Sequence, residues 1–68
     1  MPKVIKVIEL VGVSEQSFSD AVRQAVGEAS KTVRGITGVD VLQSSATVND
    51  NQIAEYHVNV KIAFELER

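Results

Sequence analysis

The sequence predicts an α+β fold in one domain over residues 1–68, with the order strand, helix, strand, strand and a three-stranded antiparallel sheet. Apolar residues in segment 18–33 recur at spacings of three and four, as on one face of a helix. In segment 53–66 the even positions from 56 onward are apolar and the odd ones mostly polar, as in a strand with one buried face. The sequence Asn-Asp-Asn at 49–51 is a turn signal that precedes this strand.

The first strand is predicted over Lys3 to Val11, because this segment is rich in β-branched residues. Its apolar residues fall on both faces, which predicts at least partial cover on both sides. Gly12 is expected to end the strand, Ser14 to be the N-cap of the helix, and Gly35 to form its C-terminal cap. The helical stripe consists largely of small residues that allow close packing on a sheet: Phe18, Ala21, Val22, Ala25, Val26, Ala29 and Val33.

Two more strands are predicted, over Gly38 to Val48 and over Ile53 to Leu66, joined as a hairpin by the turn. The helix is expected to pack across one face of the sheet. The third strand is much longer than the usual five or six residues, at about 14, so we expect it to extend past its own core and contact a neighbour. The other sheet face is either solvated or the wall of an interface or cavity in an assembly; it presents Glu55, His57, Asn59, Lys61 and Glu65.

The composition narrows the classes of function. A chain with 44% hydrophobic residues and a net charge of −2 is not typical of disorder, and no stretch approaches the roughly 20 apolar residues of a membrane span. The absence of cysteine excludes disulfides and thiolate metal sites. Dispersed basic residues argue against nucleic-acid or membrane binding. The start of the chain lacks the apolar core of a signal peptide, so we expect a cytoplasmic protein. A chain of this size without disulfides or a structural metal ion often relies on homo-oligomerisation.

Two small groups of polar residues are candidates for a catalytic or metal-binding site. Glu55, His57 and Asn59 share a strand face, but an enzyme or metal site needs a nucleophile or further ligands. A polar histidine on a wet face is therefore the preferred interpretation. The segment 49–51 lacks the glycine and distal glutamate of a calcium loop, so it is interpreted as a turn. Acidic residues gathered from several subunits remain an alternative site for calcium or magnesium.

Segments at both ends of the chain resemble the dodecin family. The opening Lys-Val-Ile-Lys-Val-Ile-Glu-Leu-Val-Gly at 3–12 and Val-Ser-Glu-Gln-Ser-Phe at 13–18 are similar to its first strand and helix entry. Glu-Tyr-His-Val at 55–58 and Ile-Ala-Phe-Glu-Leu at 62–66 are similar to its last strand. The resemblance covers nearly the whole chain and rests on the combination of these segments. It implies a sheet wrapped around one long helix and a hollow homo-dodecamer. Many dodecins bind riboflavin or FMN between subunits as a store, and some are associated with calcium.

The resemblance implies a ligand site at Gly38, Gln43, Ser45 and His57, where this sequence departs from the family. Flavin-binding dodecins have a stacking Trp at the position of Gly38, and this chain has no Trp. His57 stands where a Gln bonds the flavin ring. Gln43 and Ser45 stand where some members have an acidic and a basic residue. Losing two stacking contacts of about 1–3 kcal/mol each would weaken flavin binding by about one to four powers of ten.

We therefore expect a non-enzymatic homo-dodecamer that binds, stores or sequesters a small molecule or ion, with riboflavin or FMN held weakly or not at all. Three alternatives stay open. In the first, the shell binds metal ions of the calcium type. In the second, it has a purely structural or interaction role. In the third, it is a genuine flavin store despite its missing Trp.

Overall fold

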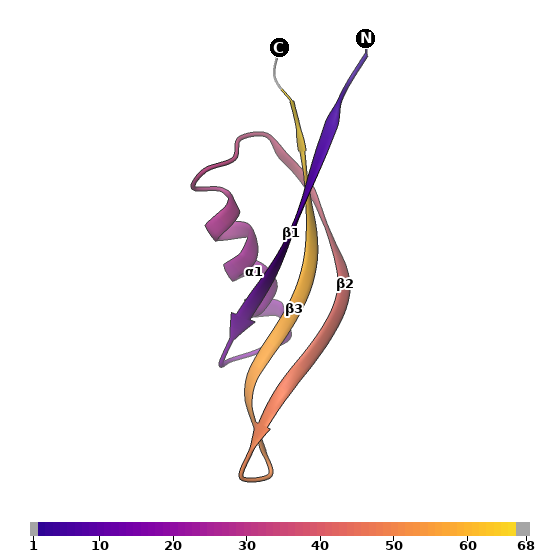
Figure 1. The fold of residues 1–68 in the computed structure, drawn as a ribbon. Coiled ribbons are helices and arrows are strands. Elements are labelled where there is room, and N and C mark those ends of the chain that lie inside the picture. The colour runs from indigo at the N-terminus through magenta and orange to yellow at the C-terminus, as the bar shows by residue number, and fades with distance from the viewer. Residues whose placement is uncertain (1, 67–68) are drawn as a thin grey trace.

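The computed structural model describes residues 2–66 and contains one sheet and one helix (Figure 1). Its elements are β1 (Ile5–Ser14), α1 (Phe18–Ala29), β2 (Ile36–Asn49) and β3 (Gln52–Glu65). The strands form an antiparallel sheet in the order β1-β3-β2, and α1 lies against one face, mainly over β1 and β3. The predicted fold class is confirmed.

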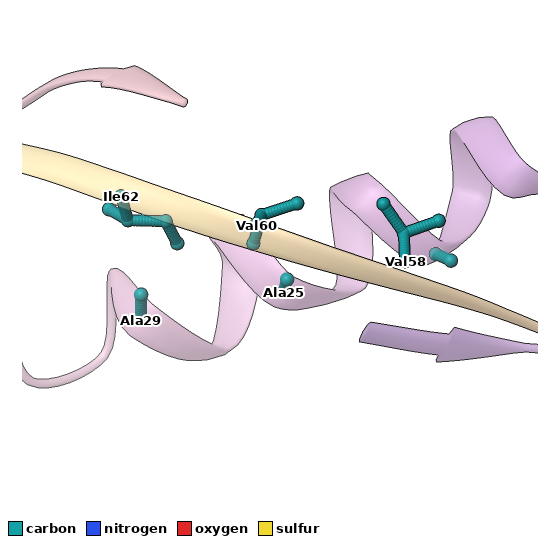
Figure 2. Packing of buried hydrophobic residues seen from close by; sticks show 6 residues of the cluster. Ala25, Ala29, Val58, Val60 and Ile62 are labelled. Atoms are coloured by element: carbon teal, nitrogen blue, oxygen red, sulfur yellow. The ribbon is translucent and has the colours of Figure 1, made fainter. Parts of the chain in front are cut away.

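The core lies between β3 and α1. Val58, Val60 and Ile62 are at most 1% exposed, as the alternation of β3 predicts. They pack against three buried alanines of the helical stripe, two of which Figure 2 labels beside them. Alanine side chains are short, so the helix axis can lie close to the sheet and bury the branched side chains of β3 completely.

Gly12 marks the closest approach between β1 and α1. A Cβ at this position would fall on the carbonyl oxygen of Ala21 and lie 3.2 Å from the Cβ of Ala25. The strand does not end there, because Gly12 pairs with Val58 and the pairing continues to Ser14. The expectation that Gly12 ends the strand was therefore wrong: the glycine serves close packing against the helix.

The N-terminus of α1 is capped by Ser17 and not by Ser14, so that prediction was wrong. The Ser17 hydroxyl accepts a hydrogen bond from the Asp20 amide at 3.0 Å. Ser14 is the last residue of β1 and is 6% exposed. Its hydroxyl donates to the Asp20 carboxylate at 2.7 Å and accepts from the Gln16 amide at 2.9 Å. Ser14 thus holds the connection between β1 and α1 in place.

The C-terminus of α1 comes earlier than predicted. The helix ends at Ala29 with Ser30 as its C-cap, so Val33 lies outside it. Hydroxyl groups of Ser30 and Thr32 bond to carbonyl oxygens of the last helical turn, at 2.7 and 3.5 Å, and such bonds compete with continued helix. Gly35 has a φ of +74° but lies at the entry to β2. Its predicted role as the helix cap was wrong.

The two long strands form the predicted hairpin. Asp50 and Asn51 have φ values of 52° and 63°, which is the left-handed pair of a two-residue type I′ turn. β2 begins at Ile36, two residues before the predicted Gly38, and β3 is displaced by one residue toward the turn. The pairing of β2 with β3 shifts register at three places, so β2 does not keep one strict alternation.

The molecule is long and thin, because the β2–β3 hairpin extends beyond the helix (Figure 1). Its extents are 54 × 20 × 13 Å, and its radius of gyration is 14.0 Å. A compact chain of this length would have a radius of gyration of about 11 Å. The buried core among residues 2–66 comprises six hydrophobic residues. So small a core leaves much apolar surface exposed on the single chain.

Candidate functional site

The sheet face opposite α1, which we call the open face, carries the candidate site. Residues paired directly across strands point to the same side, so the register identifies its members. They are Ile5, Val7, Glu9, Val11 and Val13 of β1, Gly38, Asp40, Gln43, Ser45 and Thr47 of β2, and Glu55, His57, Asn59, Lys61, Ala63 and Glu65 of β3.

Three of the four candidate ligand residues lie together on the open face. Ser45 is directly opposite His57, and Gln43 is opposite Asn59 in the next row. Gly38 is opposite Ala63, six residues from His57 along β3. At roughly 3.4 Å per residue this is a separation of about 20 Å. Within one chain, Gly38 is therefore remote from the other three positions.

His57 has a defined contact with its strand neighbour. Its Nε2 lies 3.2 Å from Oε1 of Glu55, and the two side chains are 30% and 44% exposed. The predicted sharing of one face by Glu55, His57 and Asn59 is confirmed by the alternation of β3. The contact orients the imidazole ring on a partly hydrated surface, where it can donate or accept hydrogen bonds.

A shallow hollow of about 230 Å³ lies beside these residues, between β1 and β3. Its lining includes Glu9, Val11 and Asn59. Small-molecule sites usually enclose about 300–1,000 Å³, so the hollow of one chain is too small and too open to enclose such a ligand. Glu9 and Val11 were not among the predicted site residues, because the sequence alone did not show that β1 lies beside β3.

Exposed apolar residues flank the polar centre of the open face. On β1, Ile5, Val7, Val11 and Val13 are 41–55% exposed, so the single chain does not cover both faces of this strand as predicted. At the end of the hairpin, the paired residues Val48 and Ile53 are 66% and 52% exposed.

Within residues 2–66, no three side chains of the metal-binding types come together. The same part of the chain contains no helix with the length and apolar character needed to cross a membrane.

Known proteins match this chain over nearly its whole length. Residues 4–67 match the family model described as Dodecin. A curated dodecin from Thermus thermophilus is 36% identical over 67 residues, which cover 98% of this chain and 97% of that protein. The chain belongs to the dodecin family. The resemblance of its two end segments is thereby confirmed.

Solved dodecins share the fold of this family member. The dodecin of Streptomyces coelicolor superposes with a TM-score of 0.94 at 36% identity, covering 97% of this chain and 94% of that one. A calcium dodecin from Mycobacterium tuberculosis, described as a calcium-chelating antigen with a novel calcium-binding site, superposes with a TM-score of 0.82. It is 28% identical, with 94% of this chain and 91% of that one covered.

Proposed function

We propose that this chain is the subunit of a homo-dodecameric shell that binds or sequesters a small ligand without catalysing a reaction. The observation that carries the proposal is the incompleteness of the open face. Gln43, Ser45 and His57 lie together on this face, the hollow of about 230 Å³ is lined by Glu9, Val11 and Asn59 next to them, and Gly38 is far away on the same face. A second copy that covers the open face would enclose the hollow.

Exposed apolar side chains support self-association. Val11 and Val13 on β1 and the pair Val48 and Ile53 at the hairpin end are 41–66% exposed on the single chain. Fully burying one such side chain contributes about 1.5–3 kcal/mol. Contacts that bury them between copies supply the stabilisation that the small core does not.

The open face favours binding over catalysis. His57 contacts Glu55 on a partly hydrated surface, and Ser45 lies opposite the imidazole as a neutral hydroxyl. Hydroxyl, amide and imidazole groups recognise ligands through hydrogen bonds. Catalysis would also require a nucleophile held against its base and an enclosed, water-poor site.

Riboflavin and FMN are the first candidate ligands to test. Because Gly38 provides no aromatic surface, we expect riboflavin and FMN to bind weakly. The protein is first shown to be a dodecamer by light scattering, at twelve times its 7.4 kDa chain mass. Riboflavin fluorescence is then titrated with protein. Quenching that appears only at tens of micromolar protein or above agrees with the proposal. Saturation below one micromolar would show that the site is a genuine flavin store.

Calcium is a second candidate, favoured by the similarity to the calcium dodecin of Mycobacterium tuberculosis. Carboxylates are not gathered in threes within the described part of one chain, so a site would need several subunits. Calorimetric titration with calcium at low micromolar protein tests this candidate. Heat that saturates with a fixed number of ions per dodecamer would support it, and its absence would leave the small-molecule ligand.

A further inference from the structure

The contact between His57 and Glu55 has the geometry of a chelating pair. The two residues are two positions apart on β3, so their side chains leave the same face of the sheet. Their Nε2 and Oε1 atoms lie 3.2 Å apart, and the side chains are 30% and 44% exposed. Imidazole nitrogen and carboxylate oxygen are both zinc ligands, and here both can be reached from solvent.

The spacing of these two atoms matches the distance between two ligands of a single metal ion. Zinc binds imidazole nitrogen and carboxylate oxygen at about 2.0–2.2 Å. Two such ligands are about 2.9 Å apart when they subtend a right angle at the ion, and about 3.4 Å apart at the tetrahedral angle. The observed 3.2 Å lies between these values. An ion can therefore replace the hydrogen bond of the pair without a large movement of either side chain.

The neighbours of the pair on the open face leave its carboxylate available to a cation. Ser45 and Thr47 of β2 lie opposite His57 and Glu55, and their hydroxyl groups are neutral. Lys61, the lysine of the open face, is four residues from His57 along β3, about 14 Å away at roughly 3.4 Å per residue. A cation that approaches the pair therefore meets a carboxylate and an imidazole, with hydroxyl groups beside them that can hydrogen-bond to its waters.

The two ligand atoms select the class of ion. Calcium and magnesium take oxygen ligands, so an imidazole nitrogen does not suit them. Imidazole suits zinc, copper and nickel, and zinc sites also include carboxylates. On a single chain, water fills the other positions of the ion, because no three metal-binding side chains come together within residues 2–66.

We infer that His57 and Glu55 form a chelating site for divalent transition-metal ions of the zinc and copper type. The inference goes beyond the proposed function, because this site lies within one chain and needs neither an organic ligand nor a second copy. It differs from the calcium candidate in its nitrogen ligand. Copper is expected to bind more tightly than nickel or zinc, as it does at most sites with nitrogen and oxygen ligands.

Copper binding to the intact protein, prepared without an affinity tag, tests the inference, because His57 is the only histidine of the chain. Electron paramagnetic resonance identifies the nitrogen ligands of bound Cu²⁺, and calorimetric titration gives the affinity and the stoichiometry. We expect one imidazole nitrogen per ion and one ion per chain. Two imidazole nitrogens per ion at half that stoichiometry would also support the pair, since two copies would then share the ion.

Two variants remove the proposed ligands one at a time. His57→Gln and Glu55→Gln are each expected to weaken copper and zinc binding by about tenfold or more, since even residues that only orient a metal ligand contribute about 10–100-fold. Glu28→Gln is the matched control, because it removes an exposed carboxylate of α1, which lies against the other face of the sheet. It is expected to leave the affinity unchanged. Circular dichroism shows whether each variant keeps its secondary structure.

Competition on the unchanged protein provides a test that needs no variant. Excess calcium or magnesium is expected to leave bound Cu²⁺ in place, because neither ion suits the imidazole nitrogen. Displacement of Cu²⁺ by either ion would overturn the inference, since the site would then consist of oxygen ligands alone.

Three further outcomes would overturn the inference: no saturable binding up to millimolar Cu²⁺, unchanged affinity in both ligand variants, or a loss in only one of them. In the last case a lone imidazole or a lone carboxylate would hold the ion, and the pair would not. The proposed function is judged by the mass of the assembly and by riboflavin quenching. Its failure is therefore distinguishable from the failure of the metal site.

Discussion

Three glycines show how much the environment of a single position matters in this chain. A Cβ at Gly12 would fall on the backbone of α1, whereas a Cβ at Gly27 or Gly38 would meet no atom within 4 Å. Gly12 is thus required by packing, Gly27 is a weak point of an exposed helix surface, and Gly38 leaves room on the open face.

Gly12→Ala is expected to destabilise the protein by about 3 kcal/mol, because the new methyl group forces α1 away from the sheet. Gly27→Ala is its matched control and is expected to stabilise by about 0.5–1 kcal/mol through helix propensity. Denaturant unfolding at one fixed protein concentration compares the two variants with the unchanged chain. A Gly12→Ala protein as stable as the original would contradict the close approach of β1 and α1.

Gly38→Trp is expected to strengthen riboflavin binding by about one to four powers of ten, because it restores an aromatic surface of about 1–3 kcal/mol per contact. The position has space for a side chain within its own subunit. Gly38→Leu adds apolar bulk without an aromatic ring and should give a much smaller gain. Fluorescence quenching measures all three proteins. Equal gains from Trp and Leu would exclude stacking as the missing interaction.

At the scale of elements, the sequence predicted periodic structure better than it predicted boundaries. The period of two in β3 placed the even positions from 56 onward on the core side, and Val58, Val60 and Ile62 among them are fully buried, whereas Leu66 is 42% exposed. The helix ends depended on which hydroxyl bonded to which backbone group. Ser14 and Ser17 are both good caps by residue type, but it is the Ser17 hydroxyl that accepts from the Asp20 amide, while Ser14 is still part of β1.

The open face shows why part of the site could not be predicted. β2 shifts register between Val41 and Gln43, so odd residues face the helix before the shift and even ones after it. A one-residue shift moves every following side chain to the other face. The placement of Ser45 opposite His57 therefore depends on a bulge that alternation alone does not reveal. The family resemblance proposed both residues without that knowledge.

Ser17→Ala is expected to lower stability by about 1 kcal/mol, because the amide of Asp20 loses its hydrogen-bond acceptor at the helix start. Ser19→Ala, two residues later on an exposed helical position, should change stability by less than about 0.5 kcal/mol. Thermal unfolding of both variants, followed by circular dichroism, makes the comparison. A larger loss for Ser19→Ala would place the cap elsewhere.

At the scale of the whole molecule, the elongated shape and the exposed apolar residues both favour self-association. A chain 54 Å long with six buried hydrophobic residues in its described part has little core to stabilise its extended hairpin. In the proposed shell, contacts with other copies would bury Val48, Ile53 and the apolar side of β1 and so supply this stabilisation.

Ile53→Asp tests the hairpin end as part of that contact. A carboxylate at this position is costly to bury, so we expect the assembly to dissociate into smaller species that retain their secondary structure. Gln52→Glu adds the same charge one residue away and is the control. Light scattering gives the masses, and circular dichroism gives the secondary structure. An unchanged mass for Ile53→Asp would place the hairpin end outside the interface.

Native mass spectrometry of the unchanged protein, with and without riboflavin at tens of micromolar, tests the proposed shell most directly. We predict one dominant species with twelve times the 7.4 kDa chain mass, which gains riboflavin mass only when the ligand is added. A monomer at micromolar concentration would contradict the shell. A dodecamer that gains no mass from riboflavin, or from calcium added in the same way, would contradict ligand binding and leave a purely structural assembly.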